Sequence, residues 1–378
     1  MVKPKLIEVL VKTPEKGLSF SASHLIPKIP LPKKPIPQLR WYTNDIDSFT
    51  EHNKRWVNSE EEKPIFKMVY FDLETRCNQN CRGCFTGIGT TNPLESNQPV
   101  TDYKRLAKTI DFLKSHGGES IVYAGKGELW TKPKEAREFI EYTTDRGLGM
   151  MIFTNGTLLE EADIRWLKEK DVSLTISLRG TNERAHNELV RGRGFRKSIR
   201  AIKYALKYGF QDENRLAVEI PAINSNYQEV LNDFLPAMRY LGIVPFAEQF
   251  ILTHCPEQDK KLSLNFKQAR KFFEEAARID RLFGYEYEPV NQQRMTAQEP
   301  CRRPTYSFVV RTNGDVEDCP GTFYCHGNID IQTLKEIFES QTFKGFLNHY
   351  SGCPCSTCYT KTDKDLPKDL PFGLEDLK

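Results

Sequence analysis

Short apolar runs alternate with longer amphipathic segments from residue 66 to about residue 290, and this alternation restricts the fold more than any other feature. The segments between the runs place apolar residues on one helical face. Strands that alternate with helices predict a parallel sheet built from βα units. We therefore expect an α/β fold, a partial (β/α)6 TIM-like barrel, with its functional loops at the C-terminal ends of the strands. The apolar runs predict six strands, at residues 68–73, 121–124, 150–153, 174–178, 216–220 and 243–252.

The alternation divides the chain into three parts. Residues 1–64 are irregular and rich in proline and lysine, and we expect an N-terminal extension there. Residues 65–290 hold the predicted barrel. In residues 291–378, an Asn-Gly pair predicts a β-hairpin around 307–318, because this pair suits a tight turn. A helix around 334–347 and a cysteine-rich segment complete a small C-terminal domain.

Charge and hydropathy give no indication of two kinds of partner. The net charge of +3 implies neither a nucleic-acid nor a membrane-surface partner. No run approaches the roughly 20 apolar residues that a membrane span needs, and no secretory signal is visible. We therefore expect a cytoplasmic, reducing location.

Ten cysteines are present, and nine of them fall into two groups. Disulfides are rare in a reducing compartment, so clustered thiols there indicate metal ligands or redox groups. The first group is Cys77, Cys81 and Cys84, whereas Cys255 stands apart and is expected to be a small buried hydrophobe. The second group comprises Cys301, Cys319, Cys325, Cys353, Cys355 and Cys358.

The first group forms the pattern Cys-x3-Cys-x2-Cys directly after the first predicted strand. Three thiolates so close together can bind three corners of an iron–sulfur cube and leave one iron open to a small molecule. The pattern alone also fits a zinc site, which usually takes four ligands. In this position it resembles the signature of the radical S-adenosylmethionine (SAM) superfamily. The resemblance implies that Cys77, Cys81 and Cys84 hold a catalytic 4Fe–4S cluster.

Two further motifs stand where that family places residues that bind SAM. Gly125-Lys-Gly127-Glu128 follows the second predicted strand. Its glycines let the backbone approach the methionine moiety, and Glu128 can pair with the ammonium group of SAM. Asn155 lies at the end of the third predicted strand, and the resemblance assigns it to the cofactor site.

The order of motifs continues past the fourth predicted strand. The resemblance places Ser177 near the SAM ribose and gives Arg191 the SAM carboxylate as its partner; for Arg191, a surface charge at a helix start is the alternative. One residue departs from the family. Gly83 stands where the family usually has an aromatic residue against the adenine, and the adjacent Phe85 is the candidate replacement.

The second group of cysteines resembles the opening of a SPASM or twitch domain. Cys301 is followed after twelve residues by Gly314, and after four more by Cys319. The predicted hairpin folds the chain back so that Cys301 and Cys319 can approach one metal centre. The resemblance implies that Cys355 and Cys358 complete four ligands of one auxiliary 4Fe–4S cluster.

This second resemblance also has departures. A full SPASM domain carries seven cysteines and two clusters, whereas six cysteines are present here, so the single-cluster twitch version fits better. Cys353 or Cys325 is an alternative for one of the four ligands. A zinc ribbon is the structural alternative for the whole segment.

The resemblance implies a radical reaction. Reductive cleavage of SAM yields a 5′-deoxyadenosyl radical, which abstracts hydrogen from a substrate C–H bond. Asp318, beside Cys319, is the candidate base for an oxidation or rearrangement. A small-molecule substrate is favoured, and the alternative is a peptide or protein, as in sulfatase or ribosomal-peptide maturases. An electron donor such as flavodoxin or ferredoxin is the implied partner, and a non-catalytic zinc or RNA-binding protein is the remote alternative.

Overall fold

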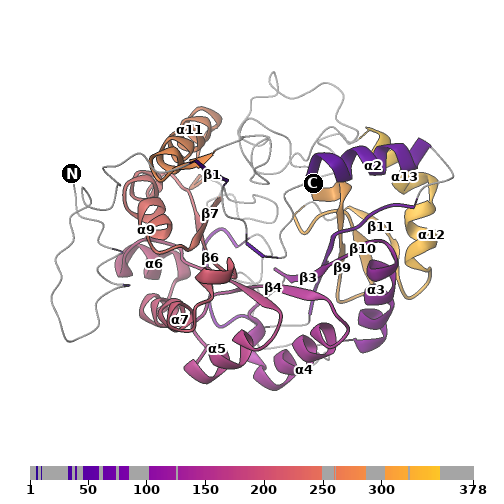
Figure 1. Cartoon of the computed structure of the whole chain (residues 1–378), viewed down its shortest axis with the longest axis horizontal. Coiled ribbons are helices and arrows are strands. Elements are labelled where there is room, and N and C mark those ends of the chain that lie inside the picture. The colour runs from indigo at the N-terminus through magenta and orange to yellow at the C-terminus, as the bar shows by residue number, and fades with distance from the viewer. Residues whose placement is uncertain are drawn as a thin grey trace.

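Figure 1 shows the computed structural model of the chain. The structure describes residues 6, 10, 33–35, 39–40, 46–58, 63–73, 76–84, 102–124, 127–248, 259, 261–286, 303–321 and 324–349.

A parallel sheet of six strands, β2 to β7, forms the centre of the described structure. Each strand pairs in parallel with the next, and each starts within two residues of its predicted start. The described strands do not close into a full barrel. The predicted α/β fold with a partial TIM-like barrel is therefore confirmed. The six strands are β2 (Met68–Phe71), β3 (Ser120–Tyr123), β4 (Gly149–Thr154), β5 (Val172–Ser177), β6 (Leu216–Pro221) and β7 (Val244–Glu248).

Helices follow an arc outside these strands (Figure 1). Helix α3 begins at a strong cap, because the Asp102 carboxylate accepts hydrogen bonds from the Lys104 and Arg105 backbone N–H groups. Helix α11 begins with a capping box between Asn265 and Gln268. The helices are α3 (Tyr103–Ser115), α4 (Pro133–Thr144), α5 (Glu161–Lys168), α6 (Glu183–Val190), α7 (Phe195–Lys207), α8 (Tyr227–Glu229), α9 (Leu235–Tyr240) and α11 (Phe266–Leu282). Shorter helical turns are η3 (Leu129–Thr131), η4 (Gln211–Glu213) and the π-helical η5 (Val230–Phe234).

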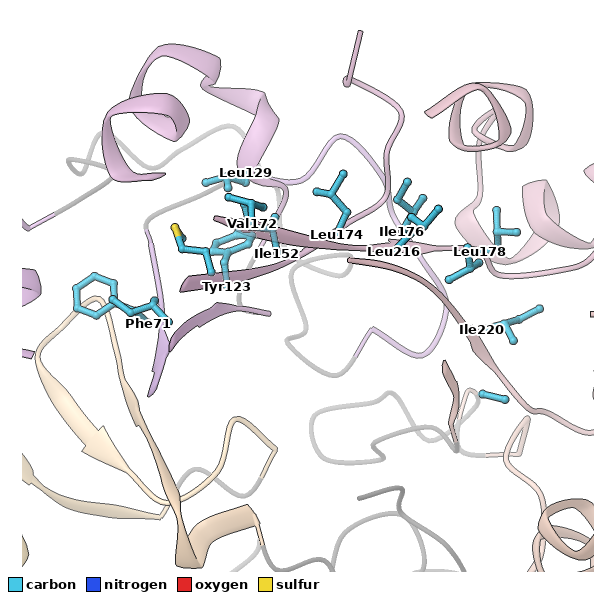
Figure 2. Close-up of a cluster of buried hydrophobic side chains, with 14 of the residues drawn as sticks. Phe71, Tyr123, Leu129, Ile152, Val172, Leu174, Ile176, Leu178, Leu216 and Ile220 are labelled. Atoms are coloured by element: carbon cyan, nitrogen blue, oxygen red, sulfur yellow. The ribbon is translucent and has the colours of Figure 1, made fainter. Parts of the chain in front are cut away.

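The main core lies between the strands and these helices. Nearly all strand residues are buried, as expected for a parallel sheet whose strands are covered on both faces. Figure 2 shows Ile152, Leu174 and Ile220, which come from three different strands and join one apolar cluster. This packing fixes the strand ends from which the functional loops start.

The C-terminal hairpin is joined to the parallel sheet. Strand β9 (Ser307–Val310) pairs in parallel with β2 and antiparallel with β10 (Asp315–Glu317), and β11 (Cys325–Asn328) pairs with β10. The predicted hairpin therefore lies directly beside the strand that precedes the first cysteine group. The short turn η7 (Arg303–Thr305) leads into β9.

The helix predicted around residues 334–347 is in fact two helices, α12 (Leu334–Glu339) and α13 (Gln341–His349). The single-helix prediction was wrong at Ser340. Its backbone is extended, and its hydroxyl accepts a hydrogen bond from the Phe343 backbone N–H. A serine that caps a new helix competes with continuation of the old one, because its side chain replaces a helical backbone partner.

Parts of residues 1–64 pack on the rest of the molecule. Helix α2 (Ile46–Asn58) contacts α13, and Asn53 Nδ2 donates to the Thr305 carbonyl. Strand β1 (Lys34–Pro35) pairs in parallel with β8 (Tyr285–Glu286). Leu6 is fully buried, and its N–H donates to the carboxylate of Asp233 in η5. The described helices include none that is both long and apolar enough to cross a bilayer.

Candidate functional site

Cys77, Cys81 and Cys84 lie on the loop that follows β2, and all three are half-buried. Burial raises the pKa of the Cys77 thiol to about 12, and the neighbouring Cys81, Glu128 and Cys84 add to this effect. Three thiols on one loop supply the donor type that an iron–sulfur cluster takes. Among the described residues, no three His, Cys, Asp or Glu side chains are arranged to hold one metal ion. The fit to a cluster rests on the donor chemistry and the shared loop.

Amide side chains tie the start of this loop to the end of β4. Asn78 Nδ2 donates to Thr157 Oγ1 at 2.8 Å, and Asn78 Oδ1 accepts from Asn155 Nδ2 at 2.8 Å. Asn155 Oδ1 in turn accepts from the Thr157 N–H and hydroxyl. The cysteine loop and the Thr-Asn-Gly turn are therefore fixed relative to each other.

A carboxylate from a distant part of the chain holds the end of the same loop. Asp259 is buried, and it accepts from Arg82 Nε and from the Gly83 N–H, both at 3.0 Å. Gly83 has a φ of +68°, a conformation that glycine adopts without steric cost. Glycine at this position therefore satisfies a backbone requirement between Cys81 and Cys84. Phe85, the candidate replacement for an aromatic residue here, lies outside the described residues.

Glu128 is the centre of the polar network at the strand ends. Its carboxylate is almost fully buried and accepts from Thr154 Oγ1 and the Asn155 N–H, both at 2.7 Å, and from the Trp130 N–H at 3.3 Å. Burial raises its pKa, and these hydrogen bonds oppose that shift. Its own N–H donates to the Arg76 carbonyl beside Cys77. Glu128 thus joins the loops that follow β2, β3 and β4.

For the other predicted SAM-binding residues, the structure gives a backbone position or an exposure. Gly127 has a φ of +99° immediately before Glu128, and Gly125 lies outside the described residues. Ser177 is half-buried at the C-terminal end of β5. Arg191 is an exposed residue in the left-handed conformation that ends α6, so it does not belong to the network around Glu128.

Sequence reasoning missed a charged pair next to the cysteine loop. Arg179, two residues after Ser177, donates from Nη1 to Glu219 Oε1 at 2.8 Å. Burial raises the pKa of the Cys81 thiol, whereas the charge of Arg179 and a hydrogen bond from its side chain lower it. In the sequence, the one feature that could have pointed to this pair is a charged residue, Arg179, just after a buried strand.

The second cysteine group is described only in part. Cys319 is buried directly after β10, and Asp318 beside it is also buried. Cys325 is exposed at the start of β11. Cys301, Cys353, Cys355 and Cys358 lie outside the described residues.

A buried ion-pair cluster links this second region to the first. Arg311 donates from Nη1 to Asp72 at 2.8 Å, from Nε to Glu317 at 2.7 Å, and from Nη2 to the Pro320 carbonyl at 3.2 Å. The three charged side chains are at most 8% exposed. Asp72 directly follows β2, the strand before the first cysteine loop, and Glu317 and Pro320 lie within two residues of Cys319. Arg311 therefore connects the two cysteine-bearing loops.

Comparison with known families and structures agrees with this arrangement. Residues 74–234 match the radical SAM superfamily, and residues 301–359 match the SPASM family, an iron–sulfur cluster-binding domain. The chain therefore belongs to the radical SAM superfamily and carries a C-terminal SPASM domain. The first domain implies SAM and a SAM-binding 4Fe–4S cluster, and the second implies auxiliary iron–sulfur binding.

Individual relatives are distant. The antilisterial bacteriocin subtilosin biosynthesis protein AlbA of Bacillus subtilis is 25% identical over 75% of this chain and 62% of its own length. The AdoMet-dependent heme synthase of Methanosarcina barkeri is 24% identical over 69% of both chains. The chain thus spans about two thirds of the length of these curated relatives.

Solved structures share the fold. SuiB of Streptococcus suis bound to the precursor peptide SuiA has a TM-score of 0.60 at 13% identity, covering 82% of this chain and 72% of SuiB. Native anSMEcpe with bound AdoMet has a TM-score of 0.56 at 18% identity, covering 74% of this chain and 82% of that one.

Proposed function

We propose that this chain is a radical SAM enzyme that removes a hydrogen atom from an unreactive C–H bond of its substrate. When bound, the cluster and SAM supply the chemistry, namely reductive cleavage to methionine and a 5′-deoxyadenosyl radical that abstracts the hydrogen atom. The observation that carries the proposal is the network that fastens the loop of Cys77, Cys81 and Cys84 to Glu128 and Asn155 at one edge of the sheet.

The protein's own residues bind and orient these groups. Cys77, Cys81 and Cys84 would hold the cluster. Glu128 uses three of the roughly four acceptor positions of a carboxylate on internal donors. One position therefore remains for the ammonium group of SAM, in a site where the carboxylate is already fixed. Gly127 keeps the backbone beside it free of a side chain.

The remaining predicted contacts complete the proposed SAM site. Ser177 lies at the strand end that the ribose would approach, and Asn155 is fixed by three hydrogen-bonding neighbours. Gly125 would continue the glycine cradle. Arg191 is proposed as the partner of the SAM carboxylate, and its exposed position leaves its long side chain free to turn toward a ligand.

The C-terminal region would hold one auxiliary cluster on Cys301, Cys319, Cys355 and Cys358. Burial of Cys319 after the hairpin suits a ligand that is shielded from water. Such a cluster would accept the unpaired electron of the substrate radical, and Asp318 would take up the proton that the radical loses, which leaves the oxidised product. Flavodoxin or ferredoxin is proposed as the external electron donor, in a cytoplasmic setting that keeps thiols reduced.

We propose a small molecule as the substrate class. Two relatives from Methanosarcina barkeri are named for tetrapyrrole chemistry, the AdoMet-dependent heme synthase and the Fe-coproporphyrin III synthase, the latter 30% identical over 50% of this chain. A peptide is the second candidate, because AlbA matches the largest share of this chain among these relatives, 75%.

The central test is iron analysis of anaerobically reconstituted protein, with and without Cys77/Cys81/Cys84→Ala. We expect about eight irons in the wild type and about four in the variant, with SAM cleavage under dithionite only in the wild type. Four irons that fall to none would remove the auxiliary cluster and retain the enzyme class. Zinc in place of iron, without SAM cleavage, would refute the proposal and favour a structural metal protein.

The substrate class can be tested by deuterium transfer. Extract from cells that contain the protein, grown in deuterated medium, is separated by ultrafiltration into metabolite and peptide fractions. Each fraction is incubated with the reconstituted enzyme, SAM and dithionite. We expect deuterated 5′-deoxyadenosine with the metabolite fraction, and deuterium only from the peptide fraction would establish the second candidate. Protein with Cys77/Cys81/Cys84→Ala is the control for background exchange.

A further inference from the structure

The turn between α6 and α7 lies directly on the loop that carries the first three cysteines. The Arg82 N–H donates to the Leu189 carbonyl near the end of α6, at 2.8 Å. An added Cβ at Gly194 would meet Gln79 Nε2 at 2.6 Å, so the absence of a side chain there permits a close approach. Gln79 lies between the first two cysteines of the loop. The turn and the cysteine loop are therefore in direct contact.

Asn187 holds this turn in one conformation. Its Oδ1 accepts from the Gly194 and Phe195 N–H groups at 3.0 and 3.2 Å, and its carbonyl accepts from the Gly192 N–H. Arg191 adopts a left-handed φ of +51°, which is uncommon for a residue other than glycine. The backbone that presents the side chains of this turn to solvent is therefore fixed.

The exposed side of the turn is strongly basic. Residues 184–203 contain seven Lys or Arg and one Glu. Two of the seven, Arg196 and Arg200, form ion pairs with glutamates. Arg193 and Lys197 are exposed, and neither has an ion-pair partner in the part of the chain that the structure describes. These two positive charges lie four residues apart at the start of α7 and remain available to a partner.

Helix stability does not account for these charges. Gly194 begins α7 without a side-chain cap, and the first turn of the helix has no acidic residue. Positive charge at the start of a helix opposes the helix dipole, so Arg196 and Lys197 weaken this end of α7. A negatively charged partner would relieve that repulsion. The local sequence therefore favours a function in binding over one in folding.

We propose that Arg193 and Lys197 form a docking surface for a small electron-carrier protein with an acidic surface. The carrier reduces the cluster across the cysteine loop: one electron passes from the reduced carrier to the cluster, and no bond forms or breaks. Opposite charges accelerate such an encounter, and electron-transfer complexes bury little area, so a few charges suffice. This inference rests on the proposed function, and it adds the place at which the external electron donor binds.

The test compares two sources of electrons for the reconstituted holoenzyme. Dithionite is a small reductant that needs no docking surface, whereas flavodoxin, kept reduced by NADPH and its reductase, must bind. In Arg193→Glu/Lys197→Glu we expect the dithionite-driven rate of SAM cleavage to be unchanged. The rate at limiting flavodoxin should fall by about tenfold or more. Added salt should slow the flavodoxin-driven reaction of the wild type, and the variant should lose most of that dependence.

Binding is measured separately from activity, by calorimetric titration of the holoenzyme with oxidised flavodoxin at low ionic strength. The affinity should fall by about tenfold or more in Arg193→Glu/Lys197→Glu, and by less in Arg193→Gln/Lys197→Gln. The matched control is Lys267→Glu/Lys271→Glu. It reverses two exposed charges with the same spacing on α11, which lies away from α7 (Figure 1). This control should retain the affinity and the flavodoxin-driven rate of the wild type.

Three results would overturn the docking surface. The first is an unchanged affinity and flavodoxin-driven rate in Arg193→Glu/Lys197→Glu, and the second is an equal loss in the control. The third is binding of an RNA oligonucleotide that depends on Arg193 and Lys197 when flavodoxin binding does not. A wild type that cleaves no SAM with either reductant would instead refute the proposed function, and the calorimetric titration would still test the surface.

Discussion

The two cysteine-bearing regions of this molecule are supported in different ways. In the first region, the loop of residues 77–84, the three ligands are close in sequence. Side-chain amide hydrogen bonds and a backbone hydrogen bond to the buried Asp259 carboxylate hold the loop. In the second region, the hairpin β9–β10 and the loop after it, the proposed ligands are spread over residues 301–358. Pairing of β9 with β2 and the Arg311 ion-pair cluster hold that region.

This difference makes the second region dependent on the first. The first loop emerges from β2, which is a central strand of the sheet with neighbours on both sides. The hairpin extends the same sheet from β2 outward, and Asp72, directly after β2, supplies one partner of Arg311. Disruption at their junction should therefore affect the second region more than the first.

The largest effect is expected for Arg311→Met. Removal of the guanidinium takes away the buried positive charge that pairs with Asp72 and Glu317, which costs about 3–5 kcal/mol of unfolding free energy. We expect loss of about four irons, with the SAM-sensitive cluster signal retained. Urea unfolding and iron analysis measure the two effects.

The matched control is Arg239→Met. Arg239 and Asp280 form an equally buried ion pair at 2.7 Å, between α9 and α11 of the barrel. This variant should lose similar stability but keep both sets of iron. Equal iron content in the two variants would refute the inference that the second region depends on its junction with the first.

Lowering the pH should decrease the unfolding free energy through His186, which lies beside the first region. Burial, assisted by the charge of Arg179, lowers the pKa of His186 to about 4. Between about pH 6.5 and pH 4 the unfolded chain therefore binds a proton that the folded chain does not, so stability is full above about pH 6.5 and falls as the pH decreases. The loss should reach about 3 kcal/mol.

His186→Gln tests this prediction, because the glutamine carbonyl can still accept from the Arg179 N–H, as His186 Nδ1 does. Unfolding free energies of both proteins are compared at pH 7 and at intervals down to pH 4.5. The difference in unfolding free energy between the wild type and His186→Gln should narrow or reverse as the pH falls. A constant difference across this range would show that His186 is not the titrating group.

Glu128→Gln should weaken SAM binding in the first region without loss of iron from either region. The new amide nitrogen must face either the Asn155 N–H or the Thr154 hydroxyl, and a donor opposite a backbone donor costs about 1–3 kcal/mol. We expect SAM affinity to fall at least tenfold by equilibrium dialysis, with the iron content of both regions unchanged. Unaltered SAM affinity would restrict Glu128 to a structural role at the strand ends.

The sequence predicted the strands well and their long-range partners poorly. Apolar periodicity located β2 to β7, because burial on both faces leaves a continuous apolar run. The same periodicity says nothing about which strands pair, so the parallel pairing of β2 with β9 was not predicted.

In the candidate site, too, residues within local motifs were predicted and residues with distant partners were not. Cys77 and Glu128 follow strands within motifs that a single sequence can show. Asp259 and Arg311 contact partners 176 and 239 residues away, and neither lies in a motif that suggests it. Their roles depend on tertiary packing, which local patterns do not encode. For Arg179, the local pattern showed a charge at a strand end but not Glu219, the residue with which it pairs.

The smallest effects should come from one glycine in each region, and they compare the two backbones directly. Gly83 in the first region and Gly314 in the second have φ angles of +68° and +88°. Replacement by alanine should cost about 1–2 kcal/mol at each position for the left-handed backbone alone. At Gly314 an added Cβ would also lie 2.8 Å from Asn328 Oδ1. That oxygen belongs to a side chain which bridges Asp315 and the Asn313 carbonyl, so it cannot move without loss of these contacts. Gly314→Ala should therefore destabilise the protein more than Gly83→Ala in urea unfolding, and the reverse order would show that the first loop is the more rigid of the two.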